Sequence, residues 1–594
     1  MKNETREKEA RGERTMRDTE NKTKENSMRG MELTAEKINS YSAAEGAKAL
    51  ADLKKQSIHA MEENEAFLMK LLQDNKDTEI GKKYDFASIK TIEEYQKRLP
   101  VTIYDDYAGY VIRDIHNNED NLMTAYPIKV YCETSGSLGN PKIVPMTVNS
   151  IHVQQKYNSL ISDAIKDMAL KPGWKKGRVM TLLESKMTEM KKGKEYGSLS
   201  AIFMQEAKAV LPLISTTPAE AIFPDGNTDT RYLQARFGLA ASDLVQISTT
   251  FLSFAAEILR YIENHWQMLV SDIETGTINS KVRMSEDIRE KIQEKITPMP
   301  ERAAELRAIF EKGFDTPFAT KVWPDLQLIS GVGTGAFEIY EYKIRERYVD
   351  ERVQFYFAGL SSTEGLFSVS LAMGDKKSAI VPHSMFYEFL PVDAQDDFSQ
   401  IVTLDKVEVG RDYEIIMTNA NGLYRYRMRD CIRIMDKYNE LPLIQFQYRL
   451  NQMAEIIDDH TEESAFTKTA MDTALQLGLD LVDYSVYPDR DAPLPRYVYF
   501  MEFAHMPEGI TREQIRTVVH KNLEKYSPDI KEYIKKGIGA PTELHILQPE
   551  TYMLYHDLMV FKGRNPAQVK PVHIIINEFH YRFFSKLIEE EWEK

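Results

Sequence analysis

A chain of 594 residues exceeds what one hydrophobic core normally organises, so its length favours two or more lobes. Lys and Arg number 76 against 91 Asp and Glu, a formal net charge of −15, which argues against nonspecific binding to nucleic acid or to anionic membrane surfaces. Two cysteines cannot build a disulfide framework or a Cys-rich zinc site, and no apolar run reaches the ~20 residues of a membrane span. We therefore expect a cytoplasmic protein with no nucleic-acid or membrane partner.

The N-terminal segment, residues 1–30, is charged, nearly devoid of large apolar residues and without a hydrophobic signal region. We expect it to be a disordered tail. From about residue 31 to 75, apolar residues recur at intervals of three and four, with acids and bases on the other face. This pattern predicts amphipathic helix.

The stretch ETSGSLGNPKIVPMT (133–147) is a candidate phosphate loop. Within it, three hydroxyl residues and two glycines precede Lys142, so backbone N–H groups, hydroxyls and one cation could converge on a triphosphate. Pro141 precedes the lysine and Ile143 follows it, so the segment lacks the G-x-x-x-x-G-K-[ST] spacing of P-loop NTPases. An exposed Ser/Gly turn between strands is the alternative.

The segments on either side of this loop predict a strand and a helix. YPIKVYCETSG (126–136) has the pattern of a strand that delivers the chain into the loop, and the segment 148–170 has a helical pattern. A strand, a Gly-rich turn and a helix in this order suit an α/β nucleotide-binding core.

The middle of the chain predicts helices without chemistry. Residues 241–278 have the pattern of one amphipathic helix rich in aromatic residues, and residues 284–314 predict helical segments separated by Pro298 and Pro300. The following WPDLQLISGVGTGAF (323–337) contains a loose G-x-G-x-x-A pattern, which we interpret as a tight loop lining a pocket.

Two further segments carry candidate nucleotide contacts. FYFAGLSSTEGLFSVS (355–370) places Thr363 and Glu364 at the end of an aromatic strand, where Thr363 could contact a phosphate and Glu364 a magnesium ion; the alternative is a cap leading into a helix. Residues 409–436 predict two strands joined by a turn at 419–422. There Asp430 could accept from both ribose hydroxyls, or it could form an ion pair with one of the arginines flanking it.

Three motifs in one order resemble the nucleotide-binding motifs of the acyl-adenylating superfamily, which includes acyl-CoA synthetases and luciferases: TSGSLGNPK (134–142), SSTEG (361–365) and YRYRMRD (424–430). A narrower resemblance, from about Tyr84 to Glu578, is to the acyl acid amido synthetases that conjugate jasmonate or auxin to amino acids. It rests on WPDLQLISGVGTGAF, PHSMFYEFLPV (382–392), TNANGLYRYRMRDCIRI (418–434), FQYRLNQMAEIIDDHTEE (446–463) and RYLQARFGL (231–239).

This resemblance implies a role for each matching residue. The ATP phosphates would be cradled by Ser135, Gly136, Ser137 and Lys142, with Thr363 on the α-phosphate, Glu364 on Mg²⁺, Asp430 on the ribose and Arg449 beside an interdomain hinge. The acyl group would face Thr250, Phe337 and Ile339. In GRNPAQVKPVHI (563–574), Lys570 matches the family's mobile catalytic lysine.

The sequence departs from the family pattern at two positions. Leu360 stands where an aromatic residue commonly stacks on adenine, with Tyr356 or Phe357 as the alternative stacking residue. Arg429 stands where a glycine usually precedes the ribose-binding aspartate.

The fold implied by the resemblance is α/β, with a large N-terminal acyl-adenylating, luciferase-like domain over 31–448 and a small mobile α+β C-terminal domain over 449–594. The implied activity is an ATP- and Mg²⁺-dependent ligase that adenylates a small carboxylic acid and conjugates it to an amino acid amine. An acyl-CoA ligase and a nucleotide-binding protein without turnover are the alternatives. We expect a monomer.

Overall fold

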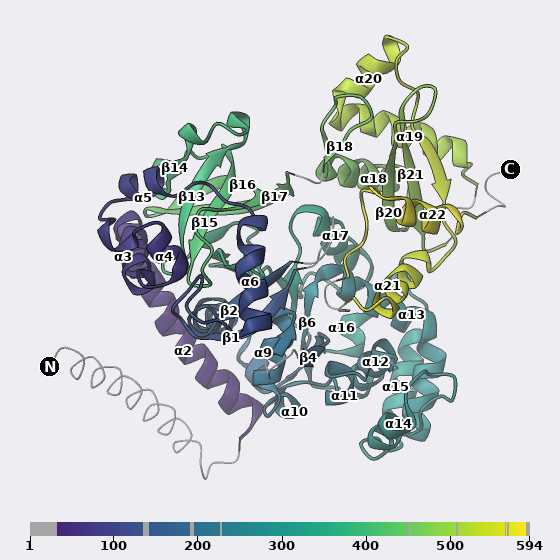
Figure 1. Cartoon of the computed structure of the whole chain (residues 1–594). Coiled ribbons are helices and arrows are strands. Elements are labelled where there is room, and N and C mark those ends of the chain that lie inside the picture. Colours follow the sequence, from purple (N-terminus) through teal and green to yellow (C-terminus); the bar gives the residue numbers. More distant parts are fainter. Residues whose placement is uncertain are drawn as a thin grey trace.

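The computed structural model describes residues 33–134, 142–189, 195–225, 228–450, 453–505, 509–564, 566 and 569–589. The predicted tail over 1–30 and the predicted phosphate contacts Ser135, Gly136 and Ser137 lie outside these ranges. The described chain forms a large part and a smaller C-terminal part, which stands at the upper right of Figure 1. None of the described helices is long and apolar enough to cross a membrane.

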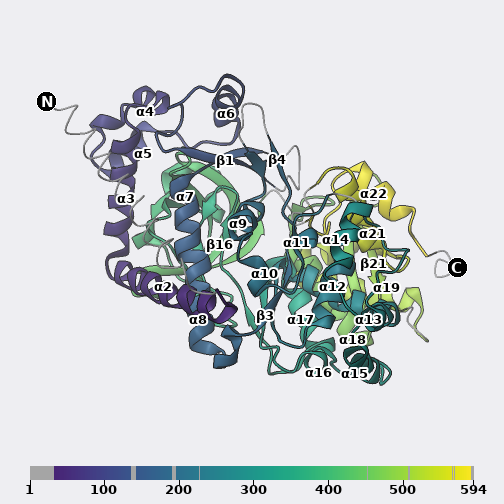
Figure 2. The same cartoon turned by 90° about the horizontal axis from the view of Figure 1, so that it is seen from below.

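Helices open the described chain. The amphipathic stretch predicted from 31 to 75 forms α2 (Ala35–Gln56) and α3 (Ala60–Asn75), separated by a short 3-10 turn at Ser57–His59. Figure 2 shows α2 beside α8 (Leu160–Ala169), and the two helices pack together. The other helices before the first strand are α4 (Glu79–Lys83), α5 (Ile92–Arg98) and α6 (Asp105–Asn117).

The candidate phosphate loop joins two strands of a hairpin. β1 (Ile128–Glu133) pairs antiparallel with β2 (Ile143–Thr147), and β5 (Glu195–Gly197) and β4 (Met187–Glu189) complete a sheet of order β2-β1-β5-β4. The predicted strand–turn–helix order is wrong in its last step. A second strand intervenes before α7 (Val148–Val153), because IVPMT finds its hydrogen-bond partners on β1.

A parallel sheet of order β3-β6-β7-β8 forms the centre of the large part. Its strands are β3 (Arg178–Leu182), β6 (Leu244–Phe251), β7 (Leu328–Val332) and β8 (Gln354–Tyr356). The prediction of one helix over 241–278 is therefore wrong at its start, because LVQISTTF is rich in β-branched residues and pairs on both sides. The helix α13 (Leu252–Thr275) follows this strand directly and ends at Gly276, whose φ of 66° is left-handed.

Helices surround this sheet. They are α9 (Leu199–Ala207), α10 (Leu211–Ile214), α11 (Ala219–Ile222), α12 (Thr230–Ala240), α14 (Glu286–Gln293), α15 (Pro300–Phe310), α16 (Ala319–Val322) and α17 (Glu338–Arg347). The predicted helices around Pro298 and Pro300 are confirmed as α14 and α15, and Pro300 occupies the first turn of α15, where a missing N–H costs nothing.

A seven-stranded sheet of order β11-β12-β17-β16-β15-β13-β14 completes the large part. Its strands are β11 (Ser368–Val369), β12 (Ser378–Ile380), β13 (Met385–Pro391), β14 (Val402–Thr403), β15 (Asp412–Asn419), β16 (Tyr426–Tyr438) and β17 (Leu441–Arg449). The predicted strand pair over 409–436 is confirmed as β15 and β16. The small hairpin of β9 (Ser361–Ser362) and β10 (Gly365–Leu366) precedes the sheet in the chain.

The C-terminal part is an α+β unit. It contains the pair β18 (Met453–Ala454) and β19 (Thr461–Glu462), the sheet β20 (Leu481–Asp489), β21 (Arg496–Phe503) and β22 (Glu543–Ile546), and the helices α18 (Glu463–Leu477), α19 (Arg512–Tyr526), α20 (Pro528–Lys535), α21 (Thr551–Phe561) and α22 (Glu578–Ser585). The segment that precedes α22 contributes only an isolated bridge between Ile574 and Val486. The apolar core of the C-terminal part is continuous with the core around α13, so the two parts are packed together.

Candidate nucleotide and acyl site

The ends of the candidate phosphate loop are fixed to each other and to the seven-stranded sheet. Thr134 and Lys142 exchange hydrogen bonds, with the Thr134 N–H donating to the Lys142 carbonyl at 2.9 Å and the Lys142 N–H donating to the Thr134 hydroxyl at 3.0 Å. The Lys142 ammonium donates to the Tyr426 hydroxyl at 3.2 Å and lies 5.5 Å from the Tyr104 ring centroid. The cation is thereby held against two aromatic rings from other elements.

Thr363 and Glu364 form the turn of the β9–β10 hairpin, so the alternative of a cap leading into a helix is wrong. The Thr363 hydroxyl donates to the carbonyl of Glu133 at 3.4 Å, which places this turn against the end of β1. The Glu364 side chain is 7% exposed and accepts from the Ser362 hydroxyl at 2.7 Å, while Asn419 donates to the Glu364 backbone carbonyl at 2.8 Å. A nearly buried carboxylate thus stands beside the phosphate loop.

Asp430 pairs with none of the arginines next to it in sequence. Its partner is Arg449, whose Nε donates to Asp430 Oδ1 at 2.7 Å across the β16–β17 pair. Arg425 forms a buried ion pair with Glu388 at 2.9 Å, and Arg427 forms another with Glu414 at 2.6 Å; both carboxylates lie on neighbouring strands. Asp430 is 4% exposed, and Oδ2 accepts no bond from a described side chain.

Arg429 adopts a backbone conformation that explains the glycine of the family pattern. Its φ is 61°, in the left-handed region that glycine enters without steric cost. Its N–H donates to Glu414 at 3.2 Å, which holds the bend that precedes Asp430.

Lys570 reaches the large part from the C-terminal part. Its ammonium lies 4.9 Å from the ring centroid of Phe251, at the junction of β6 and α13. The pKa of Lys570 is lowered to about 8, first by burial and then by the nearby charge of Arg449, while Asp430 and Glu463 act in the opposite direction. The lysine is therefore within electrostatic reach of the Asp430–Arg449 pair.

His573, three residues after Lys570, fixes this segment. Its Nδ1 lies 2.7 Å from Glu463 and its Nε2 lies 3.1 Å from Asp483, and its ring stacks on Tyr484 with centroids 4.5 Å apart. Burial opposes a charged imidazole, but the hydrogen bonds and charges of Asp483 and Glu463 outweigh it and raise the pKa of His573 to about 9. Asp483 also accepts from Tyr340 on α17 of the large part.

The predicted acyl contacts lie around Phe251. Phe337 stacks on Phe251 with ring centroids 4.7 Å apart, and the Thr250 hydroxyl is buried without a hydrogen-bond partner among the described residues. Ile339 lines a cavity of about 740 Å³ between α13, α17 and the C-terminal part, whereas Thr250 and Phe337 do not line it. Lys570 also lines this cavity.

The adenine site does not use the alternative aromatic residues. Tyr356 is 2% exposed and Phe357 is 3% exposed, and each packs inside a hydrophobic core, so neither ring is available for stacking. That prediction is wrong because Tyr356 ends the buried strand β8 and Phe357, which follows it, is buried as well. Leu360 is half-buried, and its N–H donates to the Ser368 hydroxyl at 3.1 Å.

The structure brings together Lys142, Thr363, Glu364, Asp430, Arg449 and Lys570. Tyr426 lies at the centre of this group: its hydroxyl accepts from Lys142, and its pKa is raised first by burial and then by the charge of Glu364. Sequence reasoning missed Tyr426 as a site residue, although it lies inside the YRYRMRD motif. Tyr426 is the first residue of β16, so strand alternation places its side chain on the opposite face from Arg427.

Three family models match successive segments of the chain. The N-terminal domain of the GH3 family matches residues 49–353, its central domain matches residues 378–449 and its C-terminal domain matches residues 465–578. This chain belongs to the GH3 family. The resemblance to acyl acid amido synthetases is thereby confirmed.

Curated relatives and solved structures agree with this assignment. An indole-3-acetic acid-amido synthetase, GH3.8, from Oryza sativa subsp. indica is 26% identical over 536 residues, covering 85% of this chain and 87% of the relative. Its counterpart GH3.3 from Arabidopsis thaliana is 24% identical over 554 residues, covering 86% and 90%. The solved GH3.15 acyl acid amido synthetase superposes with a TM-score of 0.80 at 21% identity, covering 91% of this chain and 96% of that one. The α/β fold with an additional C-terminal domain is therefore that of the GH3 family.

Proposed function

We propose that this GH3-family protein is an ATP-dependent ligase that adenylates a small carboxylic acid and conjugates the acyl group to the amine of an amino acid, releasing AMP and pyrophosphate. The observation that carries the proposal is the approach of Lys570, from the C-terminal part, to the Asp430–Arg449 pair and to the aromatic residues at the start of α13. A cation in this position can contact the reacting atoms of both ATP and the carboxylic acid.

The nucleotide would be held by groups from three segments. Lys142, together with Ser135, Gly136 and Ser137, would bind the phosphates, and Thr363 would contact the α-phosphate. Asp430 would accept hydrogen bonds from the ribose hydroxyls, with Arg449 holding one of its carboxylate oxygens in place. These assignments rest on the motif order and on the proximity of Lys142, Tyr426 and Glu364.

Mg²⁺ fits at Glu364. The carboxylate is nearly buried, and the described residues contain no cluster of three or more His, Cys, Asp or Glu side chains able to hold an ion on their own. This suits Mg²⁺, which in nucleotide sites takes one or two carboxylates and completes its shell with phosphate oxygens and water. When bound there, the ion supplies positive charge to the phosphates.

In the first step, a carboxylate oxygen of the acid attacks the α-phosphorus, the bond to the bridging oxygen breaks and pyrophosphate leaves. Negative charge accumulates on the phosphate oxygens, and Lys142 and Lys570 offset it. In the second step, the amine nitrogen attacks the acyl carbonyl carbon, the bond to AMP breaks and the amine gives up a proton. The acyl group would face Thr250, Phe337 and Ile339.

The division of the chain follows from these roles. We infer an N-terminal domain over 31–448 and a mobile C-terminal domain over 449–594, since Arg449 ends the last strand of the large part. A monomer in the cytoplasm is proposed as well; both cysteines are free and buried thiols, as suits a reducing compartment.

The proposal is tested by screening carboxylic acids for acid-dependent ATP–pyrophosphate exchange, and then pairing each active acid with amino acids and detecting amide by mass spectrometry. Exchange followed by amide formation is expected. Thioester formation with coenzyme A and no amide with any amino acid would identify an acyl-CoA ligase instead. ATP binding without exchange for any acid would identify a nucleotide-binding protein.

A further inference from the structure

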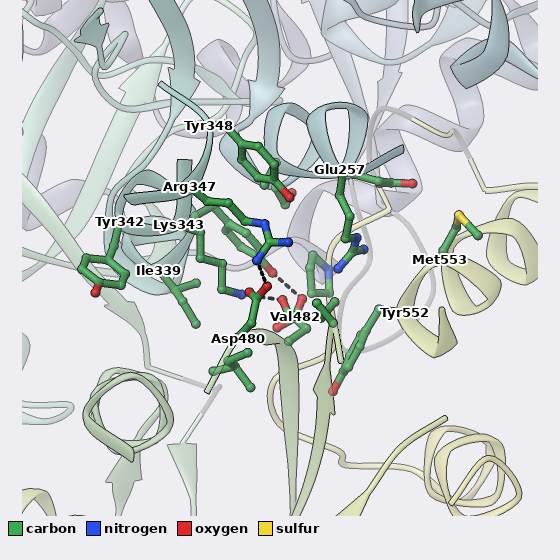
Figure 3. A pocket seen from close by; sticks show the side chains of 18 of the residues that line it. Glu257, Ile339, Tyr342, Lys343, Arg347, Tyr348, Asp480, Val482, Tyr552 and Met553 are labelled. Carbon is green, nitrogen blue, oxygen red and sulfur yellow. Dashed lines mark hydrogen bonds and ion pairs between the residues drawn. The ribbon is translucent and has the colours of Figure 1, made fainter. Parts of the chain in front are cut away.

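The 740 Å³ cavity is walled by both parts of the chain. The large part contributes one face of α13 and residues of α17, and the C-terminal part contributes α18, β20, α21 and the segment that carries Lys570. Figure 3 shows Glu257 on one side of the cavity and Tyr552 and Met553 on the other, with Lys343, Arg347 and Asp480 between α17 and β20. The cavity therefore begins at the proposed reaction centre and extends along the interface.

Polar side chains line the cavity along α13. Ser253, Glu257, Arg260 and Asn264 recur at intervals of four and three, so they lie on one face of the helix and all line the cavity. Ser253 is only 9% exposed, and its hydroxyl has no hydrogen-bond partner among the described residues. A buried hydroxyl without a partner costs free energy, which a bound ligand recovers by completing the bond.

Several charged side chains of the cavity have partners among the described residues. Arg347 binds Glu263 at 2.5 Å and also Asp480, and Lys343 donates to the carbonyl of Val482. Glu257 is held at 2.7 Å by Arg231 from behind the cavity. Within the described part of the chain, no carboxylate lies within ion-pairing distance of Arg260, although this arginine is half-buried.

Glu502 lies close enough for the charge of Arg260 to affect its pKa, but these two described residues form no ion pair. Glu502 accepts instead from the backbone N–H groups of Glu550 at 2.8 Å and Tyr552 at 2.9 Å. Burial raises the pKa of Glu502 to about 7, and the charge of Arg260 acts against this rise. Arg260 is thus a half-buried cation whose donors face a cavity, which is the environment of an anion-binding arginine.

We propose that this cavity is the acceptor site, in which Arg260 binds the α-carboxylate of the incoming amino acid and the Ser253 hydroxyl contacts its amine. The proposal rests on the function proposed above, because every amino acid acceptor keeps a free carboxylate while its amine reacts. Arg260 lies about 13 Å from Phe251 along the axis of α13, and its side chain leans back toward the helix N-terminus, where Lys570 stands. A carboxylate held by Arg260 at about 3 Å leaves the amine directed toward that end.

The same cavity indicates the class of acceptor. With Arg260 used by the α-carboxylate, a second carboxylate on the α17 side would meet Lys343 and Arg347, which already have partners, and it would lie near Glu263 and Asp480. The wall beyond Arg260 includes Phe314, Met471 and Leu479. The site therefore favours amino acids with neutral, mainly apolar side chains over aspartate and glutamate.

The test compares Arg260→Gln with Arg260→Lys, and with Arg345→Gln as a matched control, since Arg345 is an exposed arginine on α17 that does not line the cavity. In Arg260→Gln, KM for the amino acid in amide formation should rise on the order of tenfold to hundredfold, the effect of losing a hydrogen-bonded charge pair. The KM of Arg260→Lys for the amino acid should lie between the values of wild type and Arg260→Gln. Acid-dependent ATP–pyrophosphate exchange should keep its KM for the acid in all three variants.

A substrate change gives the decisive comparison. Wild-type protein should prefer an amino acid over its carboxamide by about the same tenfold to hundredfold factor in KM. Arg260→Gln should lose that preference, because the ion pair between Arg260 and the carboxylate is already absent from the variant whichever substrate is used. An unchanged preference in Arg260→Gln overturns the proposal. A raised KM for the acid in the exchange reaction also overturns it, by assigning Arg260 to the acyl group.

A binding measurement separates this inference from the proposed function. Saturation-transfer NMR of the twenty L-amino acids with the full chain needs no turnover. If no acid supports exchange but amino acid signals are present and vanish in Arg260→Gln, the ligase proposal fails and the acceptor site stands. If the signals are equal in wild type and variant, or absent from both, the acceptor site is refuted.

Discussion

The pH dependence of adenylation follows from the position of Lys570. Its pKa is lowered to about 8, chiefly by burial, so the ammonium is charged below that pH and neutral above it. If the charged form offsets the negative charge on the phosphates, the exchange rate should be constant from pH 6.5 to 7.5. It should then fall about tenfold per unit, with roughly one tenth left at pH 9.

Two substitutions at this position separate charge from geometry. Lys570→Arg keeps its charge over the whole range, so its exchange rate should show no decline near pH 8, whatever its rate at pH 7. Lys570→Ala should slow exchange on the order of 10²–10³, the effect of deleting one preorganised charge at a transition state. Amide formation from a synthetic acyl-adenylate should be spared, because the activated bond already exists.

Lys343 provides the matched control, because burial lowers its pKa to about 8 as well and it lines the same cavity. The exchange rate of Lys343→Gln should decline with pH as it does in the wild-type protein. The reasoning is refuted if the wild-type rate stays constant to pH 10, or if Lys570→Arg retains the decline. Equal loss of both half-reactions in Lys570→Ala would indicate misfolding or a shared role.

Three other predictions concern ATP, the interdomain contact and stability. Asp430→Ala should weaken ATP binding at least tenfold by calorimetry, because each hydrogen bond to a charged acceptor contributes roughly 1.5–3 kcal/mol. Asp557→Asn removes the negative charge and one of the two oxygens that accept from Arg231 at 2.8 Å, contacts that join α21 to α12. With Asp557 40% exposed, the loss is about 1 kcal/mol, so exchange should fall severalfold. The pKa of His573 is raised to about 9, so its protonation stabilises the fold fully below the unfolded pKa near 6.5, and this contribution is lost as pH rises through 9. The urea midpoint of unfolding should therefore fall over that interval, and it should fall less in His573→Gln.

Each of these has an outcome that contradicts it. Unchanged ATP affinity in a folded Asp430→Ala protein removes Asp430 from the site. If Asp557→Asn catalyses exchange at the wild-type rate in both low and high salt, the ion pair between Asp557 and Arg231 does not hold the two parts of the chain together. A His573→Gln protein that loses as much stability as wild type between pH 6.5 and 9.5 shows that another group titrates there.

The residues predicted for the nucleotide side of the site lie in short motifs, and the order of those motifs is what the sequence offers; their roles stay predictions. Asp430 was predicted from YRYRMRD, but its partner Arg449 is separated from it by a whole hairpin, and the nearby Arg425 and Arg427 bind carboxylates on other strands. Sequence spacing cannot distinguish these pairings, since they depend on strand register.

The errors share a cause. β6 was predicted as helix because its apolar residues run without interruption into α13, a pattern that a fully buried parallel strand also produces. Tyr356 and Phe357 were predicted as the alternative residues that stack on adenine. The sequence does not show that both are buried, because burial depends on which face of the sheet is covered. The cavity between the two parts has no sequence signal at all, because Arg260 and Lys570 come to line one cavity only through the tertiary arrangement.

The shared wall of that cavity has a consequence for inhibitors. A compound that fills it would touch both parts at once, so it would hold them in the arrangement described here and oppose the movement proposed for the C-terminal part. Such a compound stabilises this arrangement in proportion to the logarithm of its concentration over its dissociation constant, and its release requires the two parts to separate. Selectivity among related enzymes would then depend on how tightly each closes as well as on the residues that line the cavity.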